Sequence, residues 1–364
     1  MLRHHQEAGG GMSIMSVIDG TESTLLRRSD MIRVWFNHWF STSYRLIELM
    51  KEGADGQVCV IGSNRQKDSV IQLVCDEWYE EPDIGGEEYI CFCLEFCAEH
   101  HIDAFVPRRN MVEISRNKAR FEQAGVKVMV DDHATIELLN DKAAAYALFA
   151  DCRDLHIPDF YIVNNVCQFE QAYQKLREEY GQVCVKFVKD EGGMSFRKIA
   201  EQVDPFRQLR VYQGSGISYE MLAEALGSAA GFDDLMVMPY LPGNEISVDC
   251  LQTKKGLIAI PRNKGAARHE RVEYNSEILQ MTDTIMRRTA LEYPCNIQFK
   301  YKGDVPYLLE INTRMSGGLQ MSCLAAQVNI PRIALGKLFG RDIDWAMDRT
   351  EKTVSYIEIP QIIH

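Results

Sequence analysis

Two patterns of apolar positions divide the chain. From Met31 to Val130, short apolar runs of strand length alternate with stretches in which apolar residues recur every three or four positions. The runs predict strands at 32–36, 57–62, 103–106 and 127–130, and the stretches predict helices at 44–51, 69–78, 87–101 and 110–123. Strands that alternate with helices are typical of a parallel sheet covered by helices. We therefore expect a parallel α/β domain over residues 31–130.

The pattern changes near residue 141. Helices are predicted at 142–155, 168–180, 218–226 and 275–292, with short strands at 160–163, 183–188 and 235–238. Two further pairs of strand-like segments lie on either side of short turns, 245–251 with 257–260 and 296–301 with 305–311. Such pairs predict antiparallel hairpins. The expected fold is thus α/β: an extension without regular period over residues 1–30, the parallel domain, and an α+β domain with antiparallel sheets over 131–364.

The turn after the first predicted strand, residues 37–43, contains no glycine. A dinucleotide-binding turn needs glycines so that the backbone can approach a pyrophosphate. A dinucleotide site is therefore not expected there. The carboxyl ends of the strands still form the natural ligand crevice of such a sheet, and Asn37 and His38 could line it. A solvated loop is the alternative.

Composition and charge exclude several classes of function. Hydrophobic residues make up 46% of the chain and charged residues 25%, as in globular proteins. Acidic residues outnumber basic ones by 52 to 40, a net charge of -12, which argues against sequence-independent nucleic-acid binding. No apolar run approaches the roughly 20 residues of a membrane helix, and the first twelve residues lack a signal-peptide core. We expect a cytoplasmic protein with neither nucleic-acid nor membrane partners.

The eleven cysteines form no Cys-x-x-Cys pair. Cys91, Cys93 and Cys97 fall in one predicted helix, where only Cys93 and Cys97 share a face. Core thiols are the interpretation that a cytoplasmic protein favours, and a metal or redox site at this cluster is the alternative.

Candidate chemistry gathers on the last predicted hairpin. Glu310 and Asn312 share one strand face because side chains alternate with a period of two, and Gln298 can lie opposite them on the partner strand. One carboxylate and two amide oxygens suit magnesium that carries phosphates. Arg314, two residues further on, can stabilise a phosphoryl group during transfer. An exposed polar strand face is the alternative.

This hairpin resembles the metal-binding end of ATP-grasp enzymes, whose strand typically reads Glu-x-Asn-x-Arg. Its glutamine at the first metal position is similar to the carbamoyl-phosphate-synthetase branch. In order of elements the resemblance extends over residues 31–358. It implies a pre-ATP-grasp domain followed by a two-lobed ATP-grasp domain, with a lid lobe over about 158–240 and a metal and substrate lobe over about 241–364. It also implies ATP and Mg²⁺ as cofactors.

Three other segments carry the resemblance. Lys186 lies inside an apolar strand, where a buried ammonium is costly unless it meets an anion, and the matching family lysine contacts nucleotide phosphate. By the same resemblance, Lys142 also contacts a phosphate of the nucleotide. Met238 and Tyr240 are expected to lie beside the adenine, and Glu245 to bind the ribose hydroxyls. For Lys186 the alternative is an edge strand that faces solvent, and for Lys142 it is an ordinary surface position. For residues 236–245 the alternative is a proline-rich loop that enters a strand.

The phosphate-covering loop departs from the family pattern. It is usually rich in glycine and serine, whereas residues 190–198 read Asp-Glu-Gly-Gly-Met-Ser-Phe-Arg-Lys. Gly192 and Gly193 can offer backbone amides to phosphate. The two acids would repel phosphate and the two large apolar side chains are bulky, so catalytic competence of the lid stays open.

The substrate would lie beyond the metal hairpin. Gly317 and Gly318 precede a predicted helix whose amide-rich start can hold a carboxylate, and the family places its acceptor near this turn. Arg262 and Arg268, in an expected polar loop over 261–274, are candidate partners for the acid or its phosphate.

The resemblance implies an ATP-dependent ligase that joins a carboxylate to an amine or ammonia through an acyl phosphate and releases ADP and phosphate. Such chemistry needs positioning and charge neutralisation more than a protein nucleophile. The expected partners are small-molecule carboxylates and amines. A homodimer is one mode of assembly that we consider. The alternative is a catalytically degenerate ATP-grasp protein that acts as a nucleotide-binding regulator.

Overall fold

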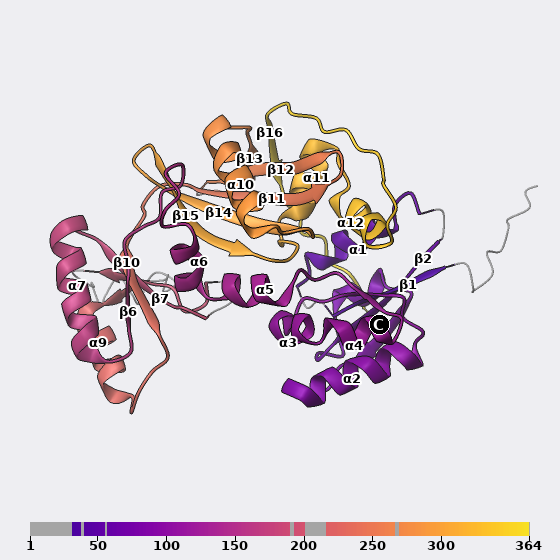
Figure 1. Cartoon of the computed structure of the whole chain (residues 1–364), viewed down its shortest axis with the longest axis horizontal. Coiled ribbons are helices and arrows are strands. Elements are labelled where there is room, and N and C mark those ends of the chain that lie inside the picture. The colour runs from indigo at the N-terminus through magenta and orange to yellow at the C-terminus, as the bar shows by residue number, and fades with distance from the viewer. Residues whose placement is uncertain are drawn as a thin grey trace, which may run out of the picture.

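The structure is a computed structural model that describes residues 31–37, 40–54, 57–189, 193–200, 216–265 and 269–363. The expected extension over residues 1–30 lies outside the described residues. Within them, three sheets organise the chain, and Figure 1 shows them as three bodies joined by helices α5 (His133–Asn140) and α6 (Lys142–Leu148).

The first sheet is parallel throughout, as the sequence predicts. Its strands are β1 (Ile32–Phe36), β2 (Val58–Asn64), β3 (Glu77–Glu80), β4 (Ala104–Val106) and β5 (Lys127–Val128), in the spatial order β3-β2-β1-β4-β5. Helices α1 (Ser43–Lys51), α2 (Gly86–Glu99), α3 (Met111–Arg116) and α4 (Lys118–Gln123) belong to the same body (Figure 1). The chain adds β2 and β3 on one side of β1 and then returns to add β4 on the other side, so the strand order reverses between β1 and β4.

Two predicted helices of this domain are wrong in detail. The segment 69–78 forms a single 3-10 turn, η2 (Val70–Leu73), and then enters β3, because Asp76 ties the chain to β2: its carboxylate accepts the Val60 amide at 2.7 Å and its own amide donates to the Val60 carbonyl. The segment 110–123 breaks into α3 and α4 at Asn117, whose side chain donates to the Glu113 carbonyl and competes with the helical hydrogen bond.

The second sheet has the order β6-β10-β7-β8-β9 and is covered by helices α7 (Val166–Tyr180) and α9 (Tyr219–Ser228). Its strands are β6 (Tyr161–Val163), β7 (Val183–Phe187), β8 (Arg197–Ala200), β9 (Gly216–Ser218) and β10 (Leu235–Pro239). All its pairs are antiparallel except β8 with β9. The helix predicted over 142–155 ends at Leu148, where Phe149 donates to the Tyr146 carbonyl and tightens the last turn.

The third sheet is antiparallel at every described pair and has the order β15-β14-β11-β12-β13-β16. Its strands are β11 (Glu245–Thr253), β12 (Gly256–Lys264), β13 (His269–Val272), β14 (Cys295–Lys302), β15 (Val305–Asn312) and β16 (Lys352–Ser355). Helices α10 (Ser276–Thr289), α11 (Leu319–Ala326) and α12 (Ile330–Leu338) lie beside it (Figure 1). Both predicted hairpins, β11–β12 and β14–β15, are confirmed.

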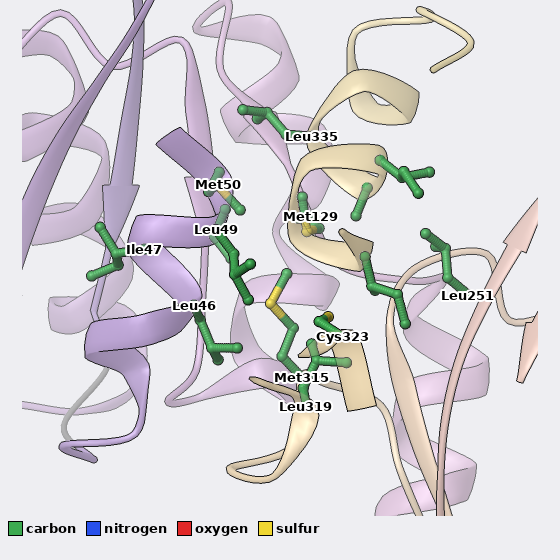
Figure 2. Close-up of a cluster of buried hydrophobic side chains, with 14 of the residues drawn as sticks. Leu46, Ile47, Leu49, Met50, Met129, Leu251, Met315, Leu319, Cys323 and Leu335 are labelled. Carbon is green, nitrogen blue, oxygen red and sulfur yellow. The ribbon is translucent and has the colours of Figure 1, made fainter. Parts of the chain in front are cut away.

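A shared apolar core joins the first sheet to the third. Leu46 and Met50 of α1 pack in one cluster with Leu319 of α11, Leu335 of α12 and Leu251 of β11 (Figure 2). Burial of such side chains stabilises each by roughly 1.5–3 kcal/mol. This core fixes the segment after β15 against the first domain, which matters for the site below.

No helix in the described ranges is long and apolar enough to cross a membrane. None of the eleven cysteines forms a disulfide bond. Cys93 and Cys97 are buried between α2 and the first sheet, and burial raises the pKa of Cys97 to about 12, whereas Cys91 is exposed. In the part of the chain that is described, no group of three His, Cys, Asp or Glu side chains is placed to hold a metal ion.

Candidate nucleotide and metal site

A cavity of about 410 Å³ lies between the second and third sheets. Eight residues that the sequence singled out line it: Lys142, Lys186, Gly193, Met238, Tyr240, Glu245, Gln298 and Glu310. Sequence reasoning missed its further lining residues, Cys184, Phe196, Pro239, Leu241, Lys264, Lys300 and Leu309. Segments more than 160 residues apart thus supply one cavity.

Lys186 points into this cavity from β7. Its side chain is 6% exposed, so it is not a solvent-facing edge residue. The ammonium donates to the Tyr146 hydroxyl and to the Leu309 carbonyl, each at 3.3 Å. Burial lowers the pKa of Lys186, and the charge of Glu310 opposes that shift. Both hydrogen-bond acceptors are neutral, so an anionic ligand would supply the counter-charge that burial makes valuable.

Lys142 approaches the cavity from the first turn of α6. Asp141 caps this helix by accepting the Ala144 amide at 2.9 Å, which sets the helix start at the cavity wall. Lys142 is 8% exposed and its ammonium donates to the Val188 carbonyl at 3.3 Å. An ordinary surface position, the alternative considered above, does not describe it.

The cavity carries more positive than negative charge. Four lysines line it, Lys142, Lys186, Lys264 and Lys300, against the two carboxylates of Glu245 and Glu310. Lys264 is paired with Glu245 at 2.6 Å. A concave site with surplus cationic charge attracts polyphosphates.

One end of the cavity is apolar. Met238, buried on β10, and Tyr240 lie beside Phe196 and Leu241. The Tyr240 amide donates to the Gln182 carbonyl at 2.8 Å, and the Lys198 ammonium lies 4.1 Å from the centre of the Tyr240 ring. Flat apolar walls next to backbone polar groups suit a purine base.

The other end is a row of polar side chains on β14 and β15. Gln298 lies directly opposite Glu310 in the strand register. Asn312 donates to Glu310 Oε1 at 2.9 Å, and Arg314 Nη1 donates to Asn312 Oδ1 at 2.7 Å. Gln298 and Glu310 line the nucleotide cavity, whereas Asn312 lines a smaller adjoining one. The spacing argument thus correctly predicts one continuous row.

This row fits magnesium that arrives with phosphates. Mg²⁺ is held in proteins by one or two carboxylates, with substrate phosphates and water completing the octahedron. Glu310 supplies the carboxylate and Gln298 an amide oxygen at the cavity wall. The Gln298 amide nitrogen is committed to Asn296 Oδ1 at 3.2 Å, which orients the side chain. Asn312 would have to share its oxygen with Arg314 to complete the set.

One hydrogen-bond donor of the Arg314 side chain is not used within the described structure. Its Nε is buried without a hydrogen-bond partner among the described residues. An unsatisfied buried donor costs about 1–3 kcal/mol. Arg314 lines a cavity of about 60 Å³ that shares Lys142, Leu309 and Glu310 with the larger one. An anion at the junction of the two cavities would satisfy this nitrogen.

Arg262 does not lie in a polar loop, and that expectation is wrong. It belongs to β12, and β13 begins only five residues after β12 ends. Its side chain is 1% exposed, with Nη2 3.0 Å from Asp249 Oδ2 and Nη1 bonded to Glu270. Burial alone would lower the pKa of Arg262, but the two carboxylates outweigh burial and raise it.

The Arg262 guanidinium lies directly beneath Gly318. A Cβ at Gly318 would come within 2.5 Å of its Cζ and both Nη atoms, so only glycine fits. Ser316 and Ser322, on either side of this turn, both donate to Asp249 at 2.6 Å. Arg262 therefore supports the predicted substrate turn from within.

Sequence reasoning missed Asp249 and Asn296. Asn296 is fully buried and donates to Asp249 Oδ1 at 2.8 Å, which links the Arg262 network to Gln298. The signal was available, since Asn296 shares the strand face of Gln298 and Asp249 is an acid between apolar neighbours in the middle of a strand.

Three predicted site residues remain, Gly192, Arg268 and Gly317. Gly192 and Arg268 lie outside the described residues. Gly317 lies against the first domain, because a Cβ there would be 3.2 Å from Thr42 Oγ1, and its carbonyl accepts the Tyr356 hydroxyl at 3.4 Å.

Part of the chain matches a known protein family. Residues 231–360 match the family described as ATP-grasp in the biosynthetic pathway with Ter operon. No curated protein matches the sequence.

Solved structures resemble nearly the whole chain. One is the N5-carboxyaminoimidazole synthetase of Staphylococcus aureus complexed with ADP, with a TM-score of 0.66 and 11% identity over 90% of this chain and 82% of that one. Another is the L-amino acid ligase of Bacillus licheniformis, with a TM-score of 0.60 and 13% identity over 84% and 74%. A third is the biotin carboxylase of Campylobacter jejuni with β,γ-ATP, with a TM-score of 0.63 and 16% identity over 86% and 72%.

At such identities these likenesses establish the fold. The sequence predicts the parallel first sheet and the antiparallel pairing that prevails in the two sheets around the cavity, where β8 with β9 is the one parallel pair among the described strands. Residues 231–360 thus match an ATP-grasp family, and the chain as a whole shares its fold with the solved structures described above.

Proposed function

We propose that the protein is an ATP-dependent ligase that joins a carboxylate to an amine or to ammonia through an acyl phosphate, and that releases ADP and phosphate. One observation carries the proposal: the polar row from Gln298 to Arg314 leads from a lysine-lined cavity to a guanidinium nitrogen without a partner. Such a row provides what phosphoryl transfer requires, namely a cation site and a charge beside it.

ATP would lie along the cavity with its base at the apolar end. Met238 and Tyr240 would flank the adenine, and Glu245 would accept the ribose hydroxyls once Lys264 turns toward phosphate. Lys142 and Lys186 would bind phosphate oxygens. Each of these lysine contacts is charge-assisted and so worth about 1.5–3 kcal/mol.

The γ-phosphate would then reach the polar row. Gln298, Glu310 and Asn312 would hold magnesium, which neutralises phosphate charge when bound. Arg314 would donate from Nε to the phosphoryl group in transfer, because that nitrogen has no other acceptor in the described structure. The reaction needs no nucleophile from the protein, since the substrate carboxylate attacks phosphorus itself.

The acceptor side would be formed by the turn at Gly317 and Gly318. Arg262 would act there as a positioning residue, because its guanidinium is sealed beneath Gly318 and bonded to Asp249. The assignments of Gly192 and Gly193 to phosphate and of Arg268 to substrate remain part of the proposal on sequence grounds.

Proteins of similar structure support the class of reaction. One is an amino acid ligase, one is a synthetase with ADP, and the biotin carboxylase domain dimer of a Hydrogenobacter thermophilus carboxylase binds MgADP and bicarbonate. We infer from them ATP and magnesium as cofactors, small-molecule substrates and a homodimer as one mode of assembly. A cytoplasmic location remains part of the proposal on sequence grounds.

Pooled carboxylic acids and amines, supplied with magnesium and ATP, provide the test. We expect phosphate release from some pools, and hydroxylamine should trap the acyl phosphate as a hydroxamate that mass spectrometry identifies. The Glu310→Gln variant is the matched control for contaminating ATPase. Tight ATP binding without phosphate release from any pool would instead favour a nucleotide-binding regulator, and absence of ATP binding would contradict both.

A further inference from the structure

The first sheet has a switch point, at which its strand order reverses. In open α/β sheets, ligands bind outside the carboxyl ends of the strands at this switch point. Here it lies between β1 and β4. The turn after β1 lacks the glycines that a dinucleotide requires, so a different ligand is expected.

Buried polar groups connect the two loops that follow β1 and β4 at this switch point. Asn37, the residue after β1, is fully buried. Its Oδ1 accepts the Arg108 amide at 2.7 Å, from the loop after β4, and its Nδ2 donates to the Tyr89 hydroxyl at 2.8 Å. The backbone at residues 108 and 109 is therefore held in one position at the switch point.

Arg109 is aimed by a chain of buried side chains. It forms an ion pair with Glu81, whose side chain has no exposed surface, while that of Arg109 keeps 16%. Glu81 Oε1 accepts the Ser63 hydroxyl at 2.7 Å, and Ser63 in turn accepts Trp35 Nε1 at 2.7 Å. Buried ion pairs contribute little to stability on balance, so a buried carboxylate that Ser63 orients indicates a purpose other than stability.

The Arg109 guanidinium also has unused capacity. Its Nε is buried with no hydrogen-bond partner among the described residues. The positive charge of Arg65 acts on it from nearby. A planar guanidinium with a spare donor matches the two oxygens of a carboxylate or phosphate.

The loops at this switch point contact the proposed substrate turn of the ligase site. Arg108 Nη1 donates to the Met315 carbonyl at 2.7 Å, directly after Arg314. Thr42, between β1 and α1, lies against Gly317. A substrate held at the turn can therefore extend toward the carboxyl ends of β1 and β4.

We propose that Arg109 binds an oxyanionic group of the substrate, distinct from the carboxylate that is activated. The inference rests on the proposed function and narrows its substrate class to acids or amines that carry a second anionic group, either carboxylate or phosphate. Glu81 is the positioning residue that orients the guanidinium.

Anion titration by calorimetry tests this without turnover. The full chain is first saturated with the magnesium complex of a non-hydrolysable ATP analogue, so that the γ-phosphate position is filled. Inorganic phosphate and succinate are then titrated separately. We expect saturable binding of at least one, and the two arms distinguish a phosphate from a carboxylate site.

Substitutions locate the binding. Arg109→Gln should weaken it about 10- to 100-fold, and Arg109→Lys, which keeps the charge for Glu81 but loses the fork, should weaken it less. Arg120→Gln, which breaks an exposed ion pair with Glu87 in the same domain, is the matched control and should bind as the wild type does.

Three results would overturn the proposal: no saturable anion binding, unchanged binding in both Arg109 variants, or an equal loss in Arg120→Gln. The Arg109→Lys arm keeps the test decisive if Arg109→Gln does not fold. If the ATP analogue fails to bind, the proposed function fails, and the same titrations without it still decide whether Arg109 binds an anion.

Discussion

Two regions of this molecule differ in how their charged side chains are paired. At the carboxyl edge of the first sheet, Arg109 is paired with Glu81 and Arg65 with Asp83. In the cavity between the other two sheets, lysines outnumber carboxylates, and Lys186 donates only to neutral oxygens. Surplus cationic charge suits a polyphosphate, whereas a guanidinium fixed by a buried carboxylate suits recognition of one anionic group.

The buried pair of Arg262 and Asp249 should show the largest effect on stability. Arg262→Met leaves Asp249 buried without its partner, and the expected loss in free energy of unfolding is about 3–5 kcal/mol. Urea unfolding measures it, with Arg287→Met as the control because its pair with Asp283 is exposed and should be worth at most about 1 kcal/mol. Equal, small losses in both variants would mean that Arg262 is not a structural brace of the turn.

Removing the only carboxylate of the polar row should affect chemistry rather than binding. Glu310→Gln keeps the shape and removes the charge, so turnover should fall about 10²- to 10³-fold, or roughly 2.7–4 kcal/mol. ATP should still bind through the lysines. Steady-state rates at limiting magnesium measure the effect, with Asp304→Asn in the turn of the same hairpin as the control. Normal turnover of Glu310→Gln would move the metal site elsewhere.

The cavity lysines should dominate nucleotide affinity. Lys186→Met should weaken ATP binding by about 1.5–3 kcal/mol, roughly 10- to 100-fold. Lys255→Met is the matched control, because Lys255 pairs with Asp344 on the surface. Calorimetric titration of an ATP analogue compares them. If both substitutions leave the affinity for the ATP analogue unchanged, the proposed contrast between the two regions is wrong.

A smaller effect should appear as proton uptake. Burial lowers the pKa of Lys186, and a bound phosphate stabilises the charged ammonium, so its pKa rises on binding. Nucleotide binding should therefore take up protons as the pH approaches the lowered pKa, and affinity should fall as the pH rises. Calorimetry in buffers of different ionisation heats measures the uptake. Proton release, or an uptake that persists in Lys186→Met, would contradict this origin.

The sequence correctly predicts the features that follow from the local periodicity of apolar and polar residues. The opposition of Gln298 and Glu310 follows from strand alternation and a short turn, and the parallel first sheet follows from alternating elements. Features that depend on distant contacts were missed. Asp76 bonds to β2 and so brings a segment with a helical pattern into β3. Arg262, for which the sequence predicts a polar loop, is held beneath Gly318 by residues from β11 and α11.

The Glu81 pairing of Arg109 was missed for the same reason. Nothing local distinguishes Arg109 from a solvated arginine, since its partner lies 28 residues earlier in the chain and is oriented by side chains of β1 and β2. Charged residues in expected loops are therefore the class for which sequence reasoning is weakest here.

Hydrogen exchange followed by mass spectrometry, with and without Mg·ADP, tests the central claim most directly. If the cavity between the second and third sheets is the nucleotide site, ADP should slow exchange in residues 183–187 and 235–245, and leave α2 (Gly86–Glu99) unchanged. Protection confined to the carboxyl ends of β1 and β4 would contradict the account, as would the absence of any protection at saturating ADP.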